Sequence, residues 1–254
     1  MTNNSLEKRR NDEKALDAER RLMNEALGRL KRIEQNYNMD RPAGRLIFGL
    51  DLTGSREHSL LHARIATAAM FDTIKAIGAI AVKLIYYRGN SECRAGAWHH
   101  DPAIVCRSML TLTCESGATQ IARLLRTALT EETRISGVVF VGDHCEDDPA
   151  ELRRLAQTLG QRSTPLFMFH ECADHDNRSL KAKPVFKAMA QLSGGIYVEF
   201  KPDSGAILRE MLSSVAAFSA AGVQGVKQVA FPRTPEARQL HERLLLGSGP
   251  QRGT

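Results

Sequence analysis

The stretch RLIFGLDLTGS (residues 45–55) decides how this chain is interpreted. Its first half is a nearly continuous apolar run, which is typical of a β-strand buried on both faces of a sheet. The run ends in Asp51, and the hydroxyls of Thr53 and Ser55 follow at alternate positions. A carboxylate and two hydroxyls directly after a buried strand suit a cation site, a phosphate-handling loop or the cap of a following helix.

Strand and helix patterns alternate through most of the chain after this stretch. Further strands are predicted at residues 79–88, 136–143, 164–170 and 194–200, with a turn and a short edge strand at 89–98. Helices are predicted at residues 58–77, 102–112, 119–129, 149–159, 183–192 and 204–220. This order predicts an α/β fold with a doubly wound, mostly parallel Rossmann-like sheet, one short antiparallel edge strand and helices on both faces.

Two further segments flank this α/β region. Residues 5–37 contain no Pro and a single Gly, and apolar residues recur there at intervals of seven. The pattern predicts a long, charged N-terminal helix within residues 1–40, either packed on its own domain or acting as a coiled coil or partner-binding arm. Residues 45–220 form the predicted main domain. Residues 221–254 are predicted to contain a C-terminal helix at 235–246 and a disordered tail.

Composition limits the class of protein. The chain has 254 residues, of which 43% are hydrophobic, and no apolar run reaches the roughly 20 residues that a membrane helix needs. The N-terminus has no signal-peptide core, and the five irregularly spaced cysteines are typical of reduced thiols rather than a disulfide framework. We therefore expect a soluble, cytoplasmic protein. Nucleic acid is not the expected partner despite a net charge of +6, because aromatic residues are not interleaved with the basic ones.

Polar residues whose side-chain oxygens could bind a cation lie at three separate strand or loop ends. One set is the carboxylate and hydroxyls of Asp51, Thr53 and Ser55; Thr119 opens a later helix, and Asp143 ends a later strand. In a doubly wound sheet these ends fall on the same edge, so the five side chains could converge. An all-oxygen set completed by water suits a hard cation such as Mg²⁺ or Mn²⁺.

The order of these residues resembles the metal-ion-dependent adhesion site of von Willebrand factor A (VWA) domains, and in particular that of stand-alone bacterial VWA proteins. That motif reads Asp-x-Ser/Thr-x-Ser, then a distant Thr, then an Asp at the end of a later strand. The matching positions are Asp51, Thr53, Ser55, Thr119 and Asp143. The resemblance covers roughly residues 45–220. The chain departs from the family in having Thr53 where Ser is commoner, and His144 where Gly is usual.

The resemblance implies a protein-binding module that acts through a metal ion, and it does not imply catalysis. The hydroxyls would bind the ion directly, the two carboxylates would often bind it through water, and one position would stay open for an Asp or Glu of a partner protein. Because few anionic ligands contact it, the ion attracts the incoming carboxylate. The resemblance suggests an ATPase or a multiprotein assembly as partner. We assign His144, Arg56 and Ser116 to a rim that contacts it.

Other interpretations stay open at this point. A metal-dependent hydrolase could use the same edge, although Thr53 stands where haloacid-dehalogenase-like phosphatases have a second, proton-transferring Asp. A metal-free scaffold could instead bind through the N-terminal helix. The cysteines and histidines between residues 93 and 114 lack the spacing typical of zinc sites. The acidic residues 146–148 are interpreted as a solvated helix N-terminus.

Overall fold

The computed structural model of the chain describes residues 44–57, 60, 64, 66, 80–172, 176–201 and 204–246. The predicted N-terminal helix, most of the predicted helix at 58–77 and the tail after residue 246 lie outside these residues.

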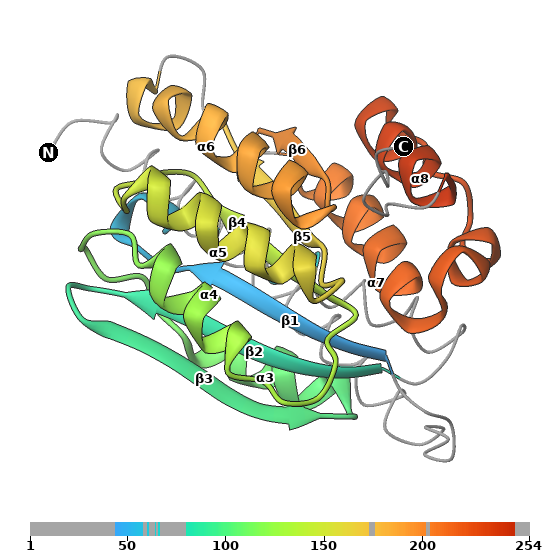
Figure 1. Cartoon of the computed structure of the whole chain (residues 1–254), viewed down its shortest axis with the longest axis horizontal. Helices are drawn as coiled ribbons and strands as arrows, with labels where there is room; N and C mark the ends of the chain where they lie inside the picture. Colours follow the sequence, from blue (N-terminus) through green and yellow to red (C-terminus); the bar gives the residue numbers. More distant parts are fainter. Residues whose placement is uncertain are drawn as a thin grey trace, which may run out of the picture.

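A six-stranded sheet of order β3-β2-β1-β4-β5-β6 forms the centre of the molecule (Figure 1). The strand bounds are β1 (Gly44–Asp51), β2 (Ile80–Arg88), β3 (Glu92–His99), β4 (Gly137–Gly142), β5 (Leu166–Glu171) and β6 (Tyr197–Phe200). Neighbouring strands are parallel except β3, which runs antiparallel to β2 along the edge. The predicted doubly wound, mostly parallel sheet is confirmed.

The antiparallel edge strand β3 ends at His99, one residue beyond the predicted end at residue 98. It has eight residues, as many as β1, and its pairing with β2 extends from Arg88 opposite Glu92 to Val82 opposite His99. A tight turn joins the two strands, and Gly89 adopts a positive φ of 56° there, which allows the chain to reverse at once.

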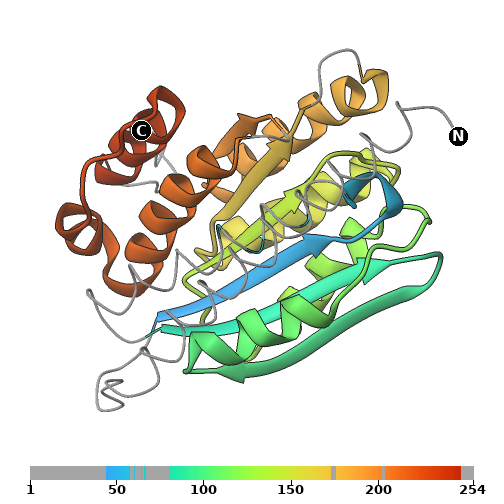
Figure 2. The ribbon, with the colours of Figure 1, turned by 180° about the vertical axis from the view of Figure 1, so that it is seen from behind.

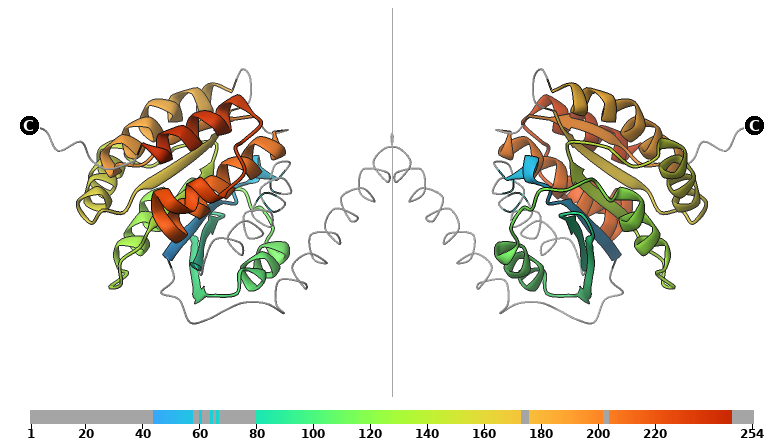
Figure 3. Two further views of the ribbon diagram at one scale, coloured as in Figure 1. Left: turned by 90° about the vertical axis from the view of Figure 1, so that its right-hand side faces the viewer. Right: turned by 90° about the vertical axis from the view of Figure 1, so that its left-hand side faces the viewer.

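Helices cover both faces of the sheet. One face carries α3 (Pro102–Thr111), α7 (Gly205–Gln228) and α8 (Pro235–Leu245), and the other carries α4 (Ile121–Leu129), α5 (Pro149–Gln161) and α6 (Asn177–Ser193). Figure 2 shows α3 and α7 in front of the sheet, and the side views of Figure 3 place α3 opposite α4. The apolar residues of β1 alternate between the two faces, so that Phe48 packs into one core and Ile47 into the opposite core.

Two helices begin at positions other than those predicted. α6 starts at Asn177 rather than residue 183, because the carboxylate of Asp176 caps it by accepting a hydrogen bond from Arg178 N at 2.9 Å. Pro184 therefore lies inside the helix instead of at its first turn, which the sequence pattern had favoured. α4 starts at Ile121, two residues after the predicted start, because the carboxylate of Asp147 accepts hydrogen bonds from Ile121 N and Ala122 N.

The C-terminal helices pack onto the sheet. α7 continues beyond the predicted end at residue 220, after a kink at Ala221 and Gly222, where Gly222 has a φ of 60°. α8 packs against α7, and Leu240 and Leu244 join the same core as β1. α7 is also a described helix with the length and composition to cross a membrane, at a mean hydropathy of 1.3. This is weak support for a membrane span, because 44% of that window is buried.

Candidate functional site

The candidate site lies where the strand order reverses, at the C-terminal ends of β1 and β4. Asp51 is the last residue of β1, Asp143 follows β4 directly, and the two strands are parallel neighbours with Leu50 opposite Val141. A methyl group added to Gly142 would lie 3.3 Å from the Cβ of Asp51, so the glycine allows the two strand ends to approach closely. The structure thus brings the two predicted carboxylates together at the switch point, where such sheets bind ligands.

Asp51 is a buried carboxylate that is only partly satisfied. Its side chain accepts a hydrogen bond from Thr53 N through Oδ1 at 2.8 Å, and the residue is 1% exposed. Its second oxygen, Oδ2, is buried and has no hydrogen bond of good geometry to any residue that the structure describes, although the Tyr87 phenol interacts with this carboxylate. Burial, and next the negative charge of Asp143, raise the pKa of Asp51 from 3.8 to about 6. A cation beside this carboxylate would relieve both unfavourable effects.

Tyr87 is a neighbour of this carboxylate that the sequence analysis did not identify. It lies opposite Asp51 in the pairing of β1 with β2 and is fully buried, and its ring stacks on Phe140 at 6.4 Å between centroids. Burial, and next the charge of Asp51, raise the pKa of Tyr87 well above 10.0, which keeps the phenol neutral. An alternating apolar strand pattern gives no signal for such a residue, because Tyr is a common core residue of strands.

Asp143, like Asp51, has a carboxylate oxygen that lacks a hydrogen bond to the described part of the chain. Its Oδ1 is buried without a hydrogen-bond partner among the described residues. Its backbone carbonyl lies 3.0 Å from His170 Nε2, and since a carbonyl oxygen only accepts, we place the imidazole proton on that nitrogen. Burial lowers the pKa of His170 to about 4, so the ring is neutral and fixes the main chain of Asp143 without adding charge.

The hydroxyls of Thr53 and Ser55 face the same region. Their oxygens are 3.3 Å apart, Thr53 is buried and Ser55 is exposed. Both belong to the turn around the short 3-10 helix η1 (Gly54–Arg56), which neither side chain caps by a hydrogen bond. The pair is therefore held in place by the local turn while keeping lone pairs for a ligand.

Thr119 is positioned by two acidic residues from the segment after β4. Its hydroxyl donates to Asp147 Oδ2 at 2.8 Å and accepts from Glu146 N at 2.8 Å, while its own N–H donates to Glu146 Oε2 at 2.9 Å. A hydroxyl oxygen has one proton and two lone pairs, so one lone pair of Thr119 remains for a cation.

The structure corrects the interpretation of the acidic segment as a solvated helix N-terminus. Only Asp148 acts in that way, by capping α5 through Ala150 N and Glu151 N. Asp147 instead accepts from Ile121 N and Ala122 N, both at 3.0 Å, and so sets the start of α4. No local signal reveals this contact, because the helix that Asp147 caps begins earlier in the sequence than the acidic segment.

Arg56 lies beneath the surface and not on an exposed rim. It is 1% exposed, and its guanidinium forms an ion pair with Glu171, which is 6% exposed. Burial alone would lower the pKa of Arg56, but the charges of Glu171, Asp143 and Asp51 raise it above its usual value. A buried guanidinium in this position is a counter-ion for the acidic cluster.

The other two predicted rim residues differ from each other. His144 is 5% exposed, and its Nε2 lies 2.5 Å from Asp176 Oδ2, so the side chain is buried rather than on an exposed rim. Ser116 is exposed, and its hydroxyl lies 2.7 Å from where a methyl group on Gly54 would be, so it borders the turn that carries the candidate ligands. Of the three, Ser116 is therefore the residue that is accessible to a partner.

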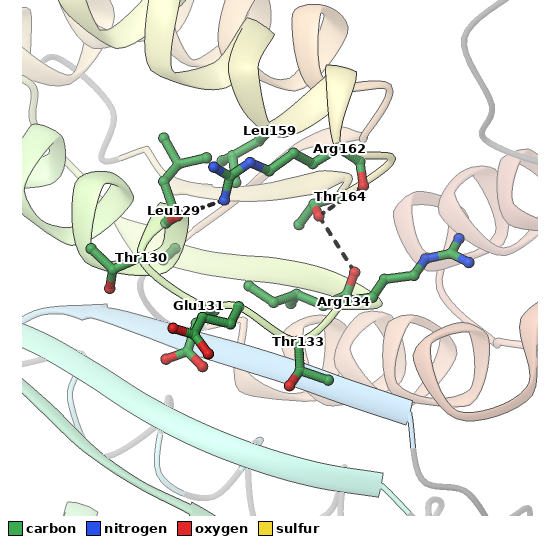
Figure 4. A pocket seen from close by; sticks show the side chains of 11 residues that line it. Leu129, Thr130, Glu131, Thr133, Arg134, Leu159, Arg162 and Thr164 are labelled. Atoms are coloured by element: carbon green, nitrogen blue, oxygen red, sulfur yellow. Dashed lines mark hydrogen bonds between the residues drawn. The ribbon is translucent and has the colours of Figure 1, made fainter.

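A cavity of about 560 Å³ lies at the opposite edge of the sheet (Figure 4). It is formed between the connections α4–β4 and α5–β5, and the Arg162 guanidinium crosses to Leu129 O at 2.5 Å. The cavity contains none of the five candidate ligands. It is therefore separate from the candidate site.

The donor set fits a hard divalent cation. Asp51 and Asp143 each have a buried carboxylate oxygen without a hydrogen-bond partner among the residues that the structure describes, and the two neighbouring hydroxyls of Thr53 and Ser55 have unused lone pairs. In the part of the chain that the structure describes, no three His, Cys, Asp or Glu side chains are grouped as metal ligands, and this includes the cysteines and histidines between residues 93 and 114. An ion at this edge would thus depend on hydroxyls and water to complete its shell.

Comparison with known proteins supports the fold. No protein-family model matches the sequence, and no curated protein matches it. Among solved structures, a von Willebrand factor type A protein from Catenulispora acidiphila is 16% identical, with a TM-score of 0.55, covering 69% of this chain and 43% of that one. The pilus adhesin SpaC from Lactobacillus rhamnosus GG is 11% identical, with a TM-score of 0.56, covering 72% and 31%. The SpRpn10 VWA domain is 12% identical, with a TM-score of 0.51, covering 69% and 95%.

This chain spans less than half of the first two of these proteins but nearly all of the SpRpn10 VWA domain. At such low identities the similarity concerns the fold. Together with the strand order and the position of the switch point, it confirms the structural part of the resemblance: the chain has the fold of a VWA domain.

Proposed function

We propose that this chain is a protein-interaction module that binds a divalent cation, Mg²⁺ or Mn²⁺, and through it captures an Asp or Glu side chain of a partner protein. The observation that carries this proposal is the pair of buried carboxylate oxygens, Asp51 Oδ2 and Asp143 Oδ1, that have no partner among the described residues. Unpaired buried acceptors are rare and costly, and at a ligand-binding edge they favour a missing cation.

The five candidate ligands would bind the ion in two ways. Thr53, Ser55 and Thr119 would contribute hydroxyl oxygens, and the carboxylates would contribute charge directly or through water. Asp147 Oδ2 accepts a hydrogen bond from the Thr119 hydroxyl, which orients that oxygen. When bound, the ion would supply an electrophilic centre for an anionic side chain.

Binding suits the site better than catalysis. Hydrolysis with Asp51 as nucleophile needs a neighbouring acid or base, and Thr53 does not transfer protons at neutral pH. Proteins of similar fold include one described as a pilus adhesin and one described as a COPII-coat protein, names that refer to adhesion and assembly. We extend the proposal to a cytoplasmic protein whose partner belongs to an ATPase or a multiprotein assembly.

Partner capture with and without chelator tests this function. The full chain, its Thr119→Val variant and a Glu131→Gln variant at the opposite edge would be immobilised and exposed to lysate in Mg²⁺ or in EDTA. We expect a set of partners that the wild type and Glu131→Gln retain in Mg²⁺, and that EDTA and Thr119→Val both release. Replacing the Asp or Glu residues of a recovered partner by Asn or Gln should abolish capture. Partners that resist both EDTA and Thr119→Val would contradict the proposal.

A further inference from the structure

We propose that Arg56 and Glu171 regulate the charge of this site and thereby set its affinity for the divalent cation. The inference rests on the proposed function, since it concerns the same edge. It assigns a role to two residues that are not among the five candidate ligands. Both residues would change the affinity for the cation through their charge rather than as ligands of the cation.

The two residues are built into the site from different elements. Arg56 ends η1, directly after the turn that carries Thr53 and Ser55, and Glu171 ends β5. β5 is the parallel neighbour of β4, so its last residue lies at the same edge as Asp143. Their ion pair therefore links the β1 turn to the far side of the switch point, with the candidate ligands close by.

The guanidinium interacts with the whole acidic cluster. The charges that raise the pKa of Arg56 are, in decreasing order, those of Glu171, Asp143 and Asp51. The same guanidinium lowers the pKa of Asp51, against the larger opposite effects of burial and Asp143. Arg does not lose its proton in proteins, so this positive charge is permanent.

Charge counting shows what the pair does. Counted by formal charge, the carboxylates of Asp51, Asp143 and Glu171 and the guanidinium of Arg56 give the buried cluster a net charge of two minus. One divalent cation balances that charge. Removal of Arg56 alone would leave three negative charges, and removal of the Glu171 charge alone would leave one. Because the cluster is buried, each such change acts with little screening.

Other charged groups nearby have their own partners. Asp147 accepts hydrogen bonds from Thr119 and the start of α4. His144 lies 3.6 Å from Asp143 through Nδ1, but its Nε2 is bound to Asp176. Arg56 is thus the side chain with permanent positive charge that the described residues place inside the cluster.

A charge series tests the inference. Mg²⁺ would be titrated by calorimetry into four full-length proteins: the wild type, Arg56→Met, Glu171→Gln and the double variant Arg56→Met/Glu171→Gln. We expect Arg56→Met to bind at least tenfold more tightly than the wild type, and Glu171→Gln at least tenfold more weakly. The double variant has the wild-type net charge and should bind within about threefold of the wild type.

The outcomes separate this inference from the proposed function. Saturable binding with one affinity in all four proteins would overturn the inference and leave the proposed function standing. Binding by Arg56→Met alone would support the inference and contradict cation binding by the wild type. Absence of binding in all four would overturn both. If Arg56→Met does not fold, the remaining three proteins still decide, because only the charge account predicts weaker binding by Glu171→Gln together with recovery in the double variant.

Discussion

Two acidic side chains, Glu131 and Asp51, lie at opposite edges of the same sheet and differ in how fully their oxygens are paired. At the N-terminal edge, Glu131 pairs with Lys83 through Oε1, while its Oε2 accepts from Trp98 Nε1 at 2.8 Å and lies 3.4 Å from Arg45. At the C-terminal edge, Asp51 Oδ1 accepts a hydrogen bond from Thr53 N, and its buried Oδ2 has no hydrogen-bond partner in the described part of the chain.

The electrostatic consequences are also opposite. Burial would raise the pKa of Glu131, but Lys83, Trp98 and Arg45 lower it below its usual value. The pKa of Asp51 is raised to about 6. Glu131 thus fastens the α4–β4 connection to β1, β2 and β3, whereas Asp51 opposes folding when ionised. A carboxylate that the described residues leave without full hydrogen bonding, at a ligand-binding edge, favours a functional site at which a bound cation supplies the compensation.

The largest effect on stability is expected from Glu131→Ala. The substitution leaves Lys83 and the Trp98 N–H without their shared acceptor, so the free energy of unfolding should fall by about 2–4 kcal/mol. Denaturant unfolding measures this change. Trp98 is the single tryptophan of the chain, and its emission should shift in this variant. An unchanged free energy of unfolding would show that the Glu131 contacts are not structural.

Asp51→Asn should raise the free energy of unfolding at neutral pH, whereas Glu131→Ala should lower it. The folded-state pKa of Asp51 is raised from 3.8 to about 6, so the folded chain binds more protons than the unfolded chain between these values. In chelator, wild-type stability should therefore fall as the pH rises through this window, by roughly 2–3 kcal/mol from this group. The variant should lack that loss and be more stable than the wild type at pH 7. Parallel pH profiles for the two proteins would contradict the assignment.

Thr119→Val should have a smaller effect on stability and a clear effect on the site. It removes the acceptor of Glu146 N and the donor to Asp147, which should cost about 1–2 kcal/mol and weaken the cation site. Thr127→Val is the matched control on the same helix, since its hydroxyl donates to Arg123 O in the preceding turn and, among the described residues, contacts none of the candidate ligands. Equal Mg²⁺ affinities in the two variants would exclude Thr119 from the ligand set.

His144→Ala should have the smallest effect on the cation. Its ring is held by Asp176, and its Nδ1 lies 3.6 Å from Asp143 Oδ2, too far for a hydrogen bond, so Mg²⁺ affinity should change by less than about threefold. Stability should fall by about 1 kcal/mol through loss of the bond to Asp176. A gain of tenfold or more in affinity would show that His144 obstructs the site, as its replacement of the usual glycine suggested.

The sequence predicted the parts of the molecule that follow from local patterns. Apolar runs ending in polar residues identified β1 and β4, and their order placed Asp51 and Asp143 at one edge. The start of α4 could not be predicted, because Asp147 caps it from a segment that follows β4. The burial of Arg56 was missed for a similar reason. Its partner Glu171 ends a strand far along the chain, and an Arg after a Ser in a turn is ordinarily exposed.

The central claim is that the Asp51–Asp143 pair is completed by a divalent cation, and calorimetric titration of Mg²⁺ at pH 7.5 tests it most directly. The account predicts saturable binding by the wild type at submillimolar Mg²⁺, with Asp51→Asn reducing the affinity at least a hundredfold and Glu131→Gln leaving it unchanged. The account is contradicted if the wild type shows no saturable binding below millimolar Mg²⁺, or if Asp51→Asn binds as well as the wild type.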